Sequence, residues 1–224
     1  MFLPARTLKR TFVLIVLPPA LAALTSCTIV HHGAGGTAEN TSAQKAAANE
    51  AFDAKAFVKT NWAKVEPELV RDAVDIREVV AALKQDQAAA EKKYGRRKDE
   101  TALFNFVVKG KEVIKSVNTE SAAGTLELGL ADPSGEAGVR VQIGPVIKSS
   151  AVRDVLSFIN FGDFTNQLDF ANISKEINFY VRDNVVSGIN RTGLAGKHLT
   201  FVGAFAEDGS GRILITPIKV EVAP

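Results

Sequence analysis

Residues 104–117 read FNFVVKGKEVIKSV, and this stretch decides the fold. Phe106 and Val108 alternate with polar or smaller neighbours, and a period of two is typical of a β-strand with one buried face. Gly110 then interrupts the pattern, and apolar residues resume within 113–117. Because a glycine inside a strand often marks a tight bend, we predict one long strand that bends near its centre.

Four further strands follow from the same criteria. Their predicted ranges are Leu126–Leu130, Val139–Ile143, Leu199–Phe205 and Ile213–Val222. The first two are separated by the turn sequence Asp-Pro-Ser-Gly at 132–135, and the last two by a glycine-containing loop at 207–211. Pro217 lies inside the last strand, where it indicates an edge or a bulge because proline cannot donate a hydrogen bond to a ladder.

A helical segment is expected between the third and fourth of these strands. Its apolar face is formed by Phe170, Ile173, Ile177 and Val181. Three strands, the first of them bent, then a helix and two more strands form the order of an OB-fold. We therefore predict an α+β protein whose residues 99–224 form an OB-fold-like antiparallel barrel. A split α+β sheet is the alternative.

Residues 41–98 are predicted to form a helical extension that packs with the barrel. Thr41 and Asp75 each stand three residues before a Gln or Glu, which is the spacing of a capping box. Ile76, Val79, Val80 and Leu83 then place one apolar stripe against a core. Gly95 is a suitable helix end. Trp62 is expected to pack in this region, and a ligand-stacking platform is the alternative.

The first 26 residues have the order of a signal peptide: three basic residues, an apolar run at 12–17, and then small residues. The sequence Leu-Thr-Ser-Cys at 24–27 resembles the bacterial lipobox, in which the cysteine is lipidated and becomes the mature N-terminus. We predict removal of residues 1–26, membrane attachment through lipidated (palmitate-bearing) Cys27, and a flexible tether over 27–40. The alternative, a transmembrane helix over 12–26, is shorter than the roughly 20 residues required and is interrupted by two prolines.

Charge and composition narrow the function classes. Removal of 26 residues leaves 198 of 224, and the loss of three basic side chains lowers the formal net charge from +2 to −1. This balance excludes the basic field of a nucleic-acid-binding protein. Thr28 replaces the aspartate that retains lipoproteins at the inner membrane, so the outer membrane is preferred. His31 and His32 have only His198 as a further histidine, and therefore no metal site and no cofactor are expected.

The candidate binding residues are polar and aromatic side chains at and after the end of the third barrel strand. They are Gln142, Arg153, Asp154, Phe161, Asp163, Phe164, Asn166 and Gln167. Aromatic rings cover the apolar faces of a sugar, while amides, carboxylates and a guanidinium bind its hydroxyls. The alternative is structural, with an Arg153–Asp154 ion pair, a helix cap at Asp163 and phenylalanines in the core.

Other polar residues give little support for catalysis. His198 is expected inside a strand, away from any recognisable Ser or Asp motif, so we predict no enzyme activity. The densest basic cluster consists of Lys92, Lys93, Arg96, Arg97 and Lys98. It is suited to anionic lipid headgroups or an acidic partner, and a solvated helix end is the alternative.

Several short motifs in combination resemble a bacterial family of predicted periplasmic lipoproteins of unknown function. They are Phe52-Asp53, Lys93-Tyr94-Gly95, Asn105-Phe106, Gln142-Ile143-Gly144-Pro145, Arg153-Asp154, Phe161-Gly162-Asp163-Phe164, Gln167, Gly196-Lys197, Gly203-Ala204-Phe205 and Thr216-Pro217. The resemblance implies an OB-like fold. Because members are often encoded near ribose-type sugar ABC importers, it also implies a role around carbohydrate uptake.

Three functional hypotheses follow. The first is a lipid-anchored periplasmic protein that assists a sugar ABC importer, through contact with an importer component or a sugar-binding protein. The second is a module that binds a small carbohydrate or a cell-wall fragment in the OB groove. The third is a structural lipoprotein of the envelope.

Overall fold

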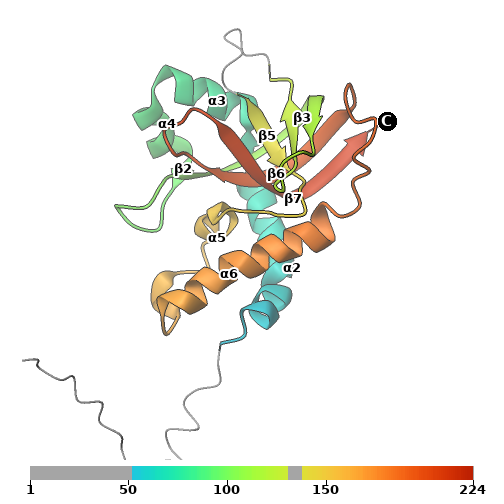
Figure 1. Cartoon of the computed structure of the whole chain (residues 1–224). Coiled ribbons are helices and arrows are strands. Elements are labelled where there is room, and N and C mark those ends of the chain that lie inside the picture. The colour runs from blue at the N-terminus through green and yellow to red at the C-terminus, as the bar shows by residue number, and fades with distance from the viewer. Residues whose placement is uncertain (1–51, 131–137, 224) are drawn as a thin grey trace, which may run out of the picture. The chain divides into compact units, whose positions relative to one another are not determined.

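The computed structural model describes residues 52–130 and 138–223, which lie within one compact unit of the chain (Figure 1). The predicted signal peptide, Cys27, the tether, the cap at Thr41 and the turn at 132–135 lie outside the described residues. No helix in the described part is long and apolar enough to cross a membrane.

Between residues 52 and 104, the structure shows three helices and two very short strands. In chain order these are α2 (Ala54–Asp72), β1 (Val74–Asp75), α3 (Ile76–Gln85), α4 (Gln87–Tyr94) and β2 (Gly95–Arg96). Asp75 caps α3 by accepting the Arg77 amide at 2.8 Å, and α4 ends at Gly95, as the sequence predicted. The side chain of Glu78 accepts the Tyr94 hydroxyl at 2.6 Å, which joins α3 to the end of α4.

The remaining chain forms the barrel and the helices inserted into it. The strands are β3 (Asn105–Asn118), β4 (Thr125–Leu128), β5 (Val139–Gln142), β6 (His198–Ala206) and β7 (Ile213–Ala223). Between β5 and β6 lie α5 (Ala151–Val155), the 3-10 turn η1 (Phe161–Asp163), α6 (Gln167–Tyr180) and the π-helical turn η2 (Val181–Val185). These strands agree with the predicted ranges to within two residues at each end.

The five long strands close into a barrel in the order β3-β4-β5-β7-β6, and β6 pairs back onto β3. All these pairs are antiparallel except β5 with β7. This is the OB-fold arrangement with its helix between the third and fourth barrel strands, so the predicted fold is confirmed and the split sheet is excluded.

The long bent strand predicted from residues 104–117 is β3. Its first part, Asn105 to Val113, pairs with β6, and its last part, Ile114 to Asn118, pairs with β4. The change of partner comes after Gly110, and a register shift follows it between Ile114 and Ser116. At Gly110, an added Cβ would lie 2.8 Å from Ile76 Cγ2, so glycine lets α3 rest directly on the strand.

The bulge predicted at Pro217 is also present. Val202 of β6 pairs with Lys219, but the next residue, Gly203, pairs with Pro217, which leaves Ile218 as an extra residue in β7. A Cβ on Gly203 would lie 2.5 Å from the Thr216 carbonyl oxygen. The bulge and the glycine together let the two strands approach closely.

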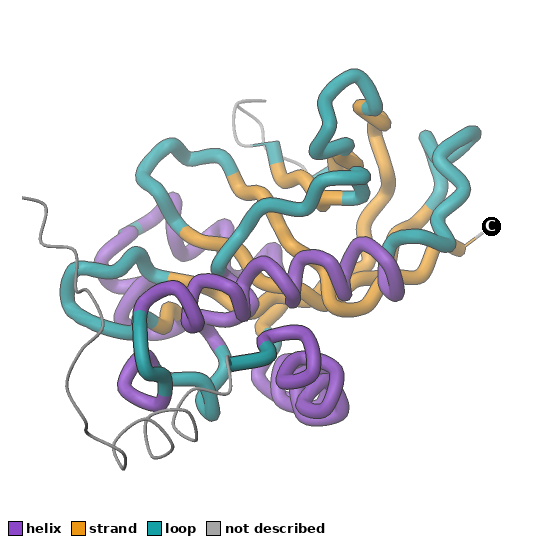
Figure 2. Tube along the Cα trace, turned by 60° about the horizontal axis from the view of Figure 1, so that its bottom comes forward, coloured by secondary structure: helices purple, strands orange, loops and turns teal. Residues whose placement is uncertain are grey.

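Two hydrophobic clusters form the core. Inward residues of the strands, such as Phe106, Phe201 and Phe205, fill the barrel, and Ile76 and Val79 of α3 join them. Outward residues of β3, β6 and β7 pack instead against α2, α5 and α6. Figures 1 and 2 show α2 and α6 together on this side of the barrel. Among the described residues, the barrel interior is therefore filled by apolar side chains.

Trp62 belongs to the second cluster. Its ring stacks on Tyr180 of α6 with the two ring centroids 3.9 Å apart and an interplanar angle of 25°. The contact ties α2 to α6, which is the packing role that the sequence favoured.

Candidate functional site

Gln142 of β5 lies inside the protein and is fully occupied by structural contacts. Its side chain is completely buried. Its Nε2 donates to Thr216 Oγ1 at 2.8 Å, and its Oε1 accepts the Lys148 amide at 3.0 Å. These bonds tie β5 to β7 and to the following loop, so the amide is not presented to a ligand.

Arg153 and Asp154 of α5 form an ion pair, the structural alternative considered from the sequence. Arg153 Nη2 lies 2.7 Å from Asp154 Oδ1, and the two side chains are only 13% and 12% exposed. The guanidinium also donates to the Phe170 carbonyl at 3.2 Å and stacks over the Phe170 ring at 3.8 Å. One edge of Arg153 still borders a surface groove.

Asp163 and Asn166 shape the turn that leads into α6. Asp163 Oδ2 accepts the Asn160 amide at 3.1 Å and so closes a capping box around η1. Asn166 is the N-cap of α6, and its Oδ1 accepts the Asp169 amide at 2.9 Å. The side chains of Asp163 and Asn166 therefore fix the backbone of η1 and of the first turn of α6.

Two of the predicted phenylalanines differ in their surroundings. Phe164 packs against Phe52 and Phe57 of the α2 region, with ring centroids 5.3 and 5.9 Å apart. Phe161 contacts the Phe170 ring edge-on at 5.5 Å but is 54% exposed. Phe161 is thus an apolar side chain held from behind by a packed aromatic cluster and open to solvent in front.

Three predicted residues meet in a groove beside the start of α6, which we call the α6 groove. It has a volume of about 570 Å³ and is lined by Lys98, Asp99, Arg153, Asn160, Phe161, Gln167, Phe170 and Ala171. The structure therefore brings Arg153, Phe161 and Gln167 together. The α6 groove lies among the helices inserted between β5 and β6, whereas the second hypothesis placed the binding groove on the OB barrel itself.

Sequence reasoning missed Lys98 and Asn160 as groove residues. Both also line a second hollow of about 540 Å³ that continues along the end of α2. Lys98 Nζ donates to the carbonyls of Leu156 and Ile159, each at 2.6 Å. Burial, which penalises the charged ammonium, lowers the pKa of Lys98 from its ordinary value of 10.5. No spacing along the sequence indicates contacts across about 60 residues.

The predicted basic cluster does not form one patch. Arg96 donates to Asp72 Oδ2 at 2.9 Å and to the Val155 carbonyl at 3.1 Å. Arg97 stacks over the Phe104 ring at 4.7 Å. Lys98 is directed to backbone carbonyls, and Lys92 and Lys93 are exposed on α4. The cations are dispersed because most of them join neighbouring segments.

The described residues offer no arrangement suited to metal chemistry. Within residues 52–130 and 138–223, no group of three or more His, Cys, Asp or Glu side chains could hold a metal ion. His198 is the exposed first residue of β6. The α6 groove combines polar and aromatic side chains, a composition that suits binding of another molecule.

The strand order and the inserted helices define an OB-fold protein with a surface groove beside α6. The solved structure of an OB-fold protein from Thermotoga maritima is similar, with a TM-score of 0.62 over 78% of this chain and 100% of that chain. The identity is 17%, so this likeness concerns the fold. No curated protein matches the chain.

A family model described as "Predicted periplasmic lipoprotein (DUF2291)" matches residues 18–221. The match spans most of the chain, and the protein belongs to this family of predicted periplasmic lipoproteins. The resemblance seen in the short sequence motifs is thereby confirmed at the level of the family.

Proposed function

We propose that the protein is a lipid-anchored, non-enzymatic accessory component of a solute importer, most specifically of a sugar ABC importer. In this proposal it acts by protein contact through the α6 groove. Phe161 carries the argument, because 54% of it is exposed while Phe170 and the aromatic cluster fix it from behind. Aromatic side chains held in this way are typical anchors of protein interfaces.

The surroundings of Phe161 support a polypeptide partner. Gln167 and Asn160 supply amide donors and acceptors, and the Asp99 carboxylate supplies a charge at the rim. Leu168, next to Gln167 on α6, is 68% exposed and adds a further apolar side chain. An apolar anchor with a mixed polar rim matches the composition of a specific but non-obligate interface.

In-cell photo-crosslinking tests this proposal. A photoreactive amino acid is placed at position 161, and a matched control is placed at Thr200, an exposed strand residue that lines neither hollow described above. A tag at the C-terminus leaves the N-terminal anchor native. We expect position 161, but not 200, to capture an importer subunit or a sugar-binding protein. Equal capture at both positions, or none at 161, would contradict the proposal.

Direct carbohydrate binding is the second candidate function. The exposed Phe161 ring stands beside the amides of Asn160 and Gln167 and the edge of Arg153, a combination that can hold a sugar ring. Isothermal titration calorimetry against mono- and oligosaccharides and cell-wall fragments tests it. A binding heat that disappears in Phe161→Ala would favour this function. If none of the tested compounds gives a binding heat, protein contact is the better explanation.

A further inference from the structure

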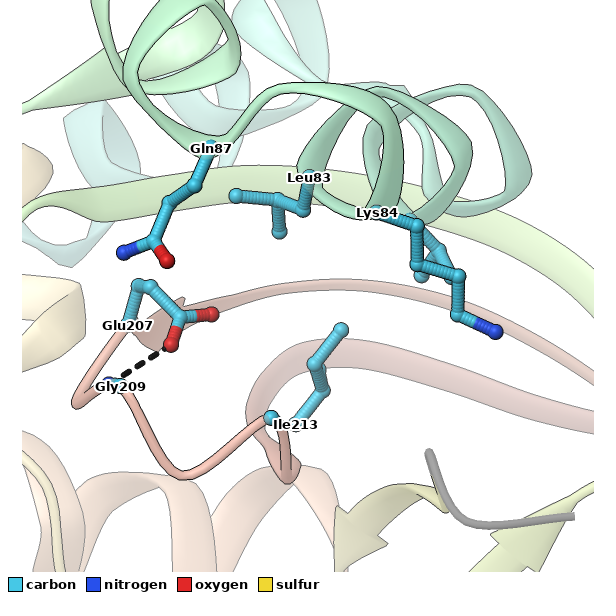
Figure 3. Close-up of a pocket in the computed structure, with 8 residues that line it drawn as sticks. Leu83, Lys84, Gln87, Glu207, Gly209 and Ile213 are labelled. Atoms are coloured by element: carbon cyan, nitrogen blue, oxygen red, sulfur yellow. Dashed lines mark hydrogen bonds between the residues drawn. The ribbon is translucent and has the colours of Figure 1, made fainter. Parts of the chain in front are cut away.

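A separate hollow lies between helices α3 and α4 and the loop that joins β6 to β7 (Figure 3). We call it the loop cleft. Its volume is about 170 Å³, and it shares no lining residue with the α6 groove. Its lining includes Leu83, Gln87, Glu207 and Ile213.

The floor of the loop cleft is apolar and firmly supported. Ile213, at the start of β7, is only 4% exposed and belongs to the cluster that fills the barrel. Leu83 of α3 packs against the same cluster from the other side. A ligand placed here would meet aliphatic carbon that the barrel core holds in position.

One end of the loop cleft presents hydrogen-bond acceptors. In Figure 3 the Gln87 amide and the Glu207 carboxylate face each other across the opening. Gln87 Nε2 already donates to Glu91 Oε1 at 2.7 Å, and Glu207 Oε1 accepts the Gly209 amide at 2.8 Å. Among the described residues, nothing donates to the Gln87 amide oxygen or to the second Glu207 oxygen. These two acceptors remain for a ligand.

The loop that closes the cleft is ordered by its own hydrogen bonds and carries no bulky side chain over the opening. Asp208 Oδ1 accepts the Ser210 amide at 2.9 Å. Gly209 and Gly211 have φ angles of +75° and +69°, which favour glycine, and a Cβ at either would meet nothing within 4 Å. The acceptors are therefore fixed before a ligand arrives.

We infer that the loop cleft binds a small primary aliphatic amine. Its ammonium group would donate to Glu207 and Gln87, and its carbon chain would lie on Leu83 and Ile213. An ammonium has three donors and no acceptor, which complements an acceptor pair that includes a carboxylate.

The size of the cleft fits this class of ligand. Liquid water occupies about 30 Å³ per molecule, so the cleft holds roughly six such volumes, which suits an amine of about four or five carbons. A neutral alcohol of the same length would bury the same carbon chain but would lack the charge-assisted bond to Glu207. Comparison of the two ligands therefore isolates the role of the charge.

The test uses the mature chain with Cys27→Ala, labelled with ¹⁵N and titrated in an NMR experiment with ethylamine, propylamine, butylamine and 1-butanol. We expect amide shifts confined to residues 80–91 and 207–213. Affinity should rise by about fourfold for each added CH₂ group, and 1-butanol should bind at least about tenfold more weakly than butylamine.

Two carboxylate variants complete the test. Glu207→Gln keeps an oxygen for the Gly209 amide but removes the charge, and it should weaken butylamine binding about tenfold. Glu120→Gln, in the exposed loop after β3, should bind like the unaltered protein. Unchanged affinity in Glu207→Gln, equal binding of butanol and butylamine, or shifts outside the cleft would overturn the assignment. A failure here leaves the proposal for the α6 groove intact, because the two sites share no residue.

Discussion

The contact between Ile76 of α3 and Gly110 of β3 gives a quantitative test of how the helical extension is attached to the barrel. Ile76 is completely buried, and a Cβ at position 110 would lie 2.8 Å from its Cγ2 and 3.1 Å from the Phe201 ring. Gly110→Ala should therefore overpack the site. Such a clash costs about 1–3 kcal/mol of folding stability, and the loss of glycine entropy in the unfolded chain returns about 0.4–1 kcal/mol.

Ile76→Ala should remove the clash while leaving a cavity. By itself it should lower the free energy of unfolding by about 2–5 kcal/mol. In the double variant Ile76→Ala with Gly110→Ala, the new methyl group occupies part of the vacated space. We expect the double variant to be no less stable than Ile76→Ala alone, which corresponds to a favourable coupling of about 1 kcal/mol or more between the two positions.

Urea unfolding followed by circular dichroism measures these values on the mature chain with Cys27→Ala. Ile76→Val is the matched control, because valine retains a methyl at the Cγ2 position and should not relieve the clash that Gly110→Ala introduces. Additive losses in the alanine double variant, within about 0.5 kcal/mol, would refute the close approach of α3 to β3. A coupling of equal size in the valine control would show that the clash has a different origin.

Four further predictions concern the candidate residues. Gln142→Leu should lower stability by about 1–3 kcal/mol, because it leaves the Lys148 amide and Thr216 hydroxyl without a partner; thermal unfolding measures this, and crosslinking from position 161 should not change. Arg153→Ala should cost about 2 kcal/mol or more, because Asp154 is left largely buried without its cation; an unaltered melting temperature together with lost binding would instead assign Arg153 to the site. Because the folded state lowers the pKa of Lys98, raising the pH toward 10.5 should stabilise the unaltered protein relative to Lys98→Met. Urea unfolding at several pH values measures the difference in unfolding free energy between the two proteins. A difference that does not change with pH would show that the burial of Lys98 is unimportant. Cys27→Ala should abolish incorporation of radiolabelled palmitate and release the protein from membranes, and continued labelling would reject Cys27 as the anchor.

The sequence predicted those parts of the fold that depend on local backbone chemistry. The alternating pattern predicted β3 as one long strand, although its change of partner and register shift lie after Gly110, and the bulge in β7 follows from Pro217. Helix and strand periods placed the remaining barrel elements. The two-residue strands β1 and β2 were missed because they are too short to show a period. Asp86 ends α3 and caps α4, so this capping residue divides the predicted helical region into two helices.

The candidate site was predicted less completely for a physical reason. Residue type shows that a side chain can form hydrogen bonds, but not whether the fold already uses them. The Gln142 amide, for example, donates a hydrogen bond to the side chain of Thr216, which is 74 positions away in the sequence. Lys98 is held beside the groove by its hydrogen bonds to the carbonyls of Leu156 and Ile159, and no spacing in the sequence predicts these contacts. Phe161 remains exposed, whereas its neighbour Phe170 is buried and Phe164 is partly buried against the same cluster.

Both proposed sites lie where helices meet the rim of the barrel. The barrel interior is filled by its own side chains, and both proposed sites lie outside it, each lined in part by helices packed around the barrel. The α6 groove depends on the α5–α6 insertion, whereas the loop cleft depends on α3, α4 and the β6–β7 loop. A change in α3 that leaves the barrel folded should therefore disturb amine binding without reducing crosslinking from Phe161. The two proposed functions can be tested separately, because the two sites are lined by different helices packed on the same barrel.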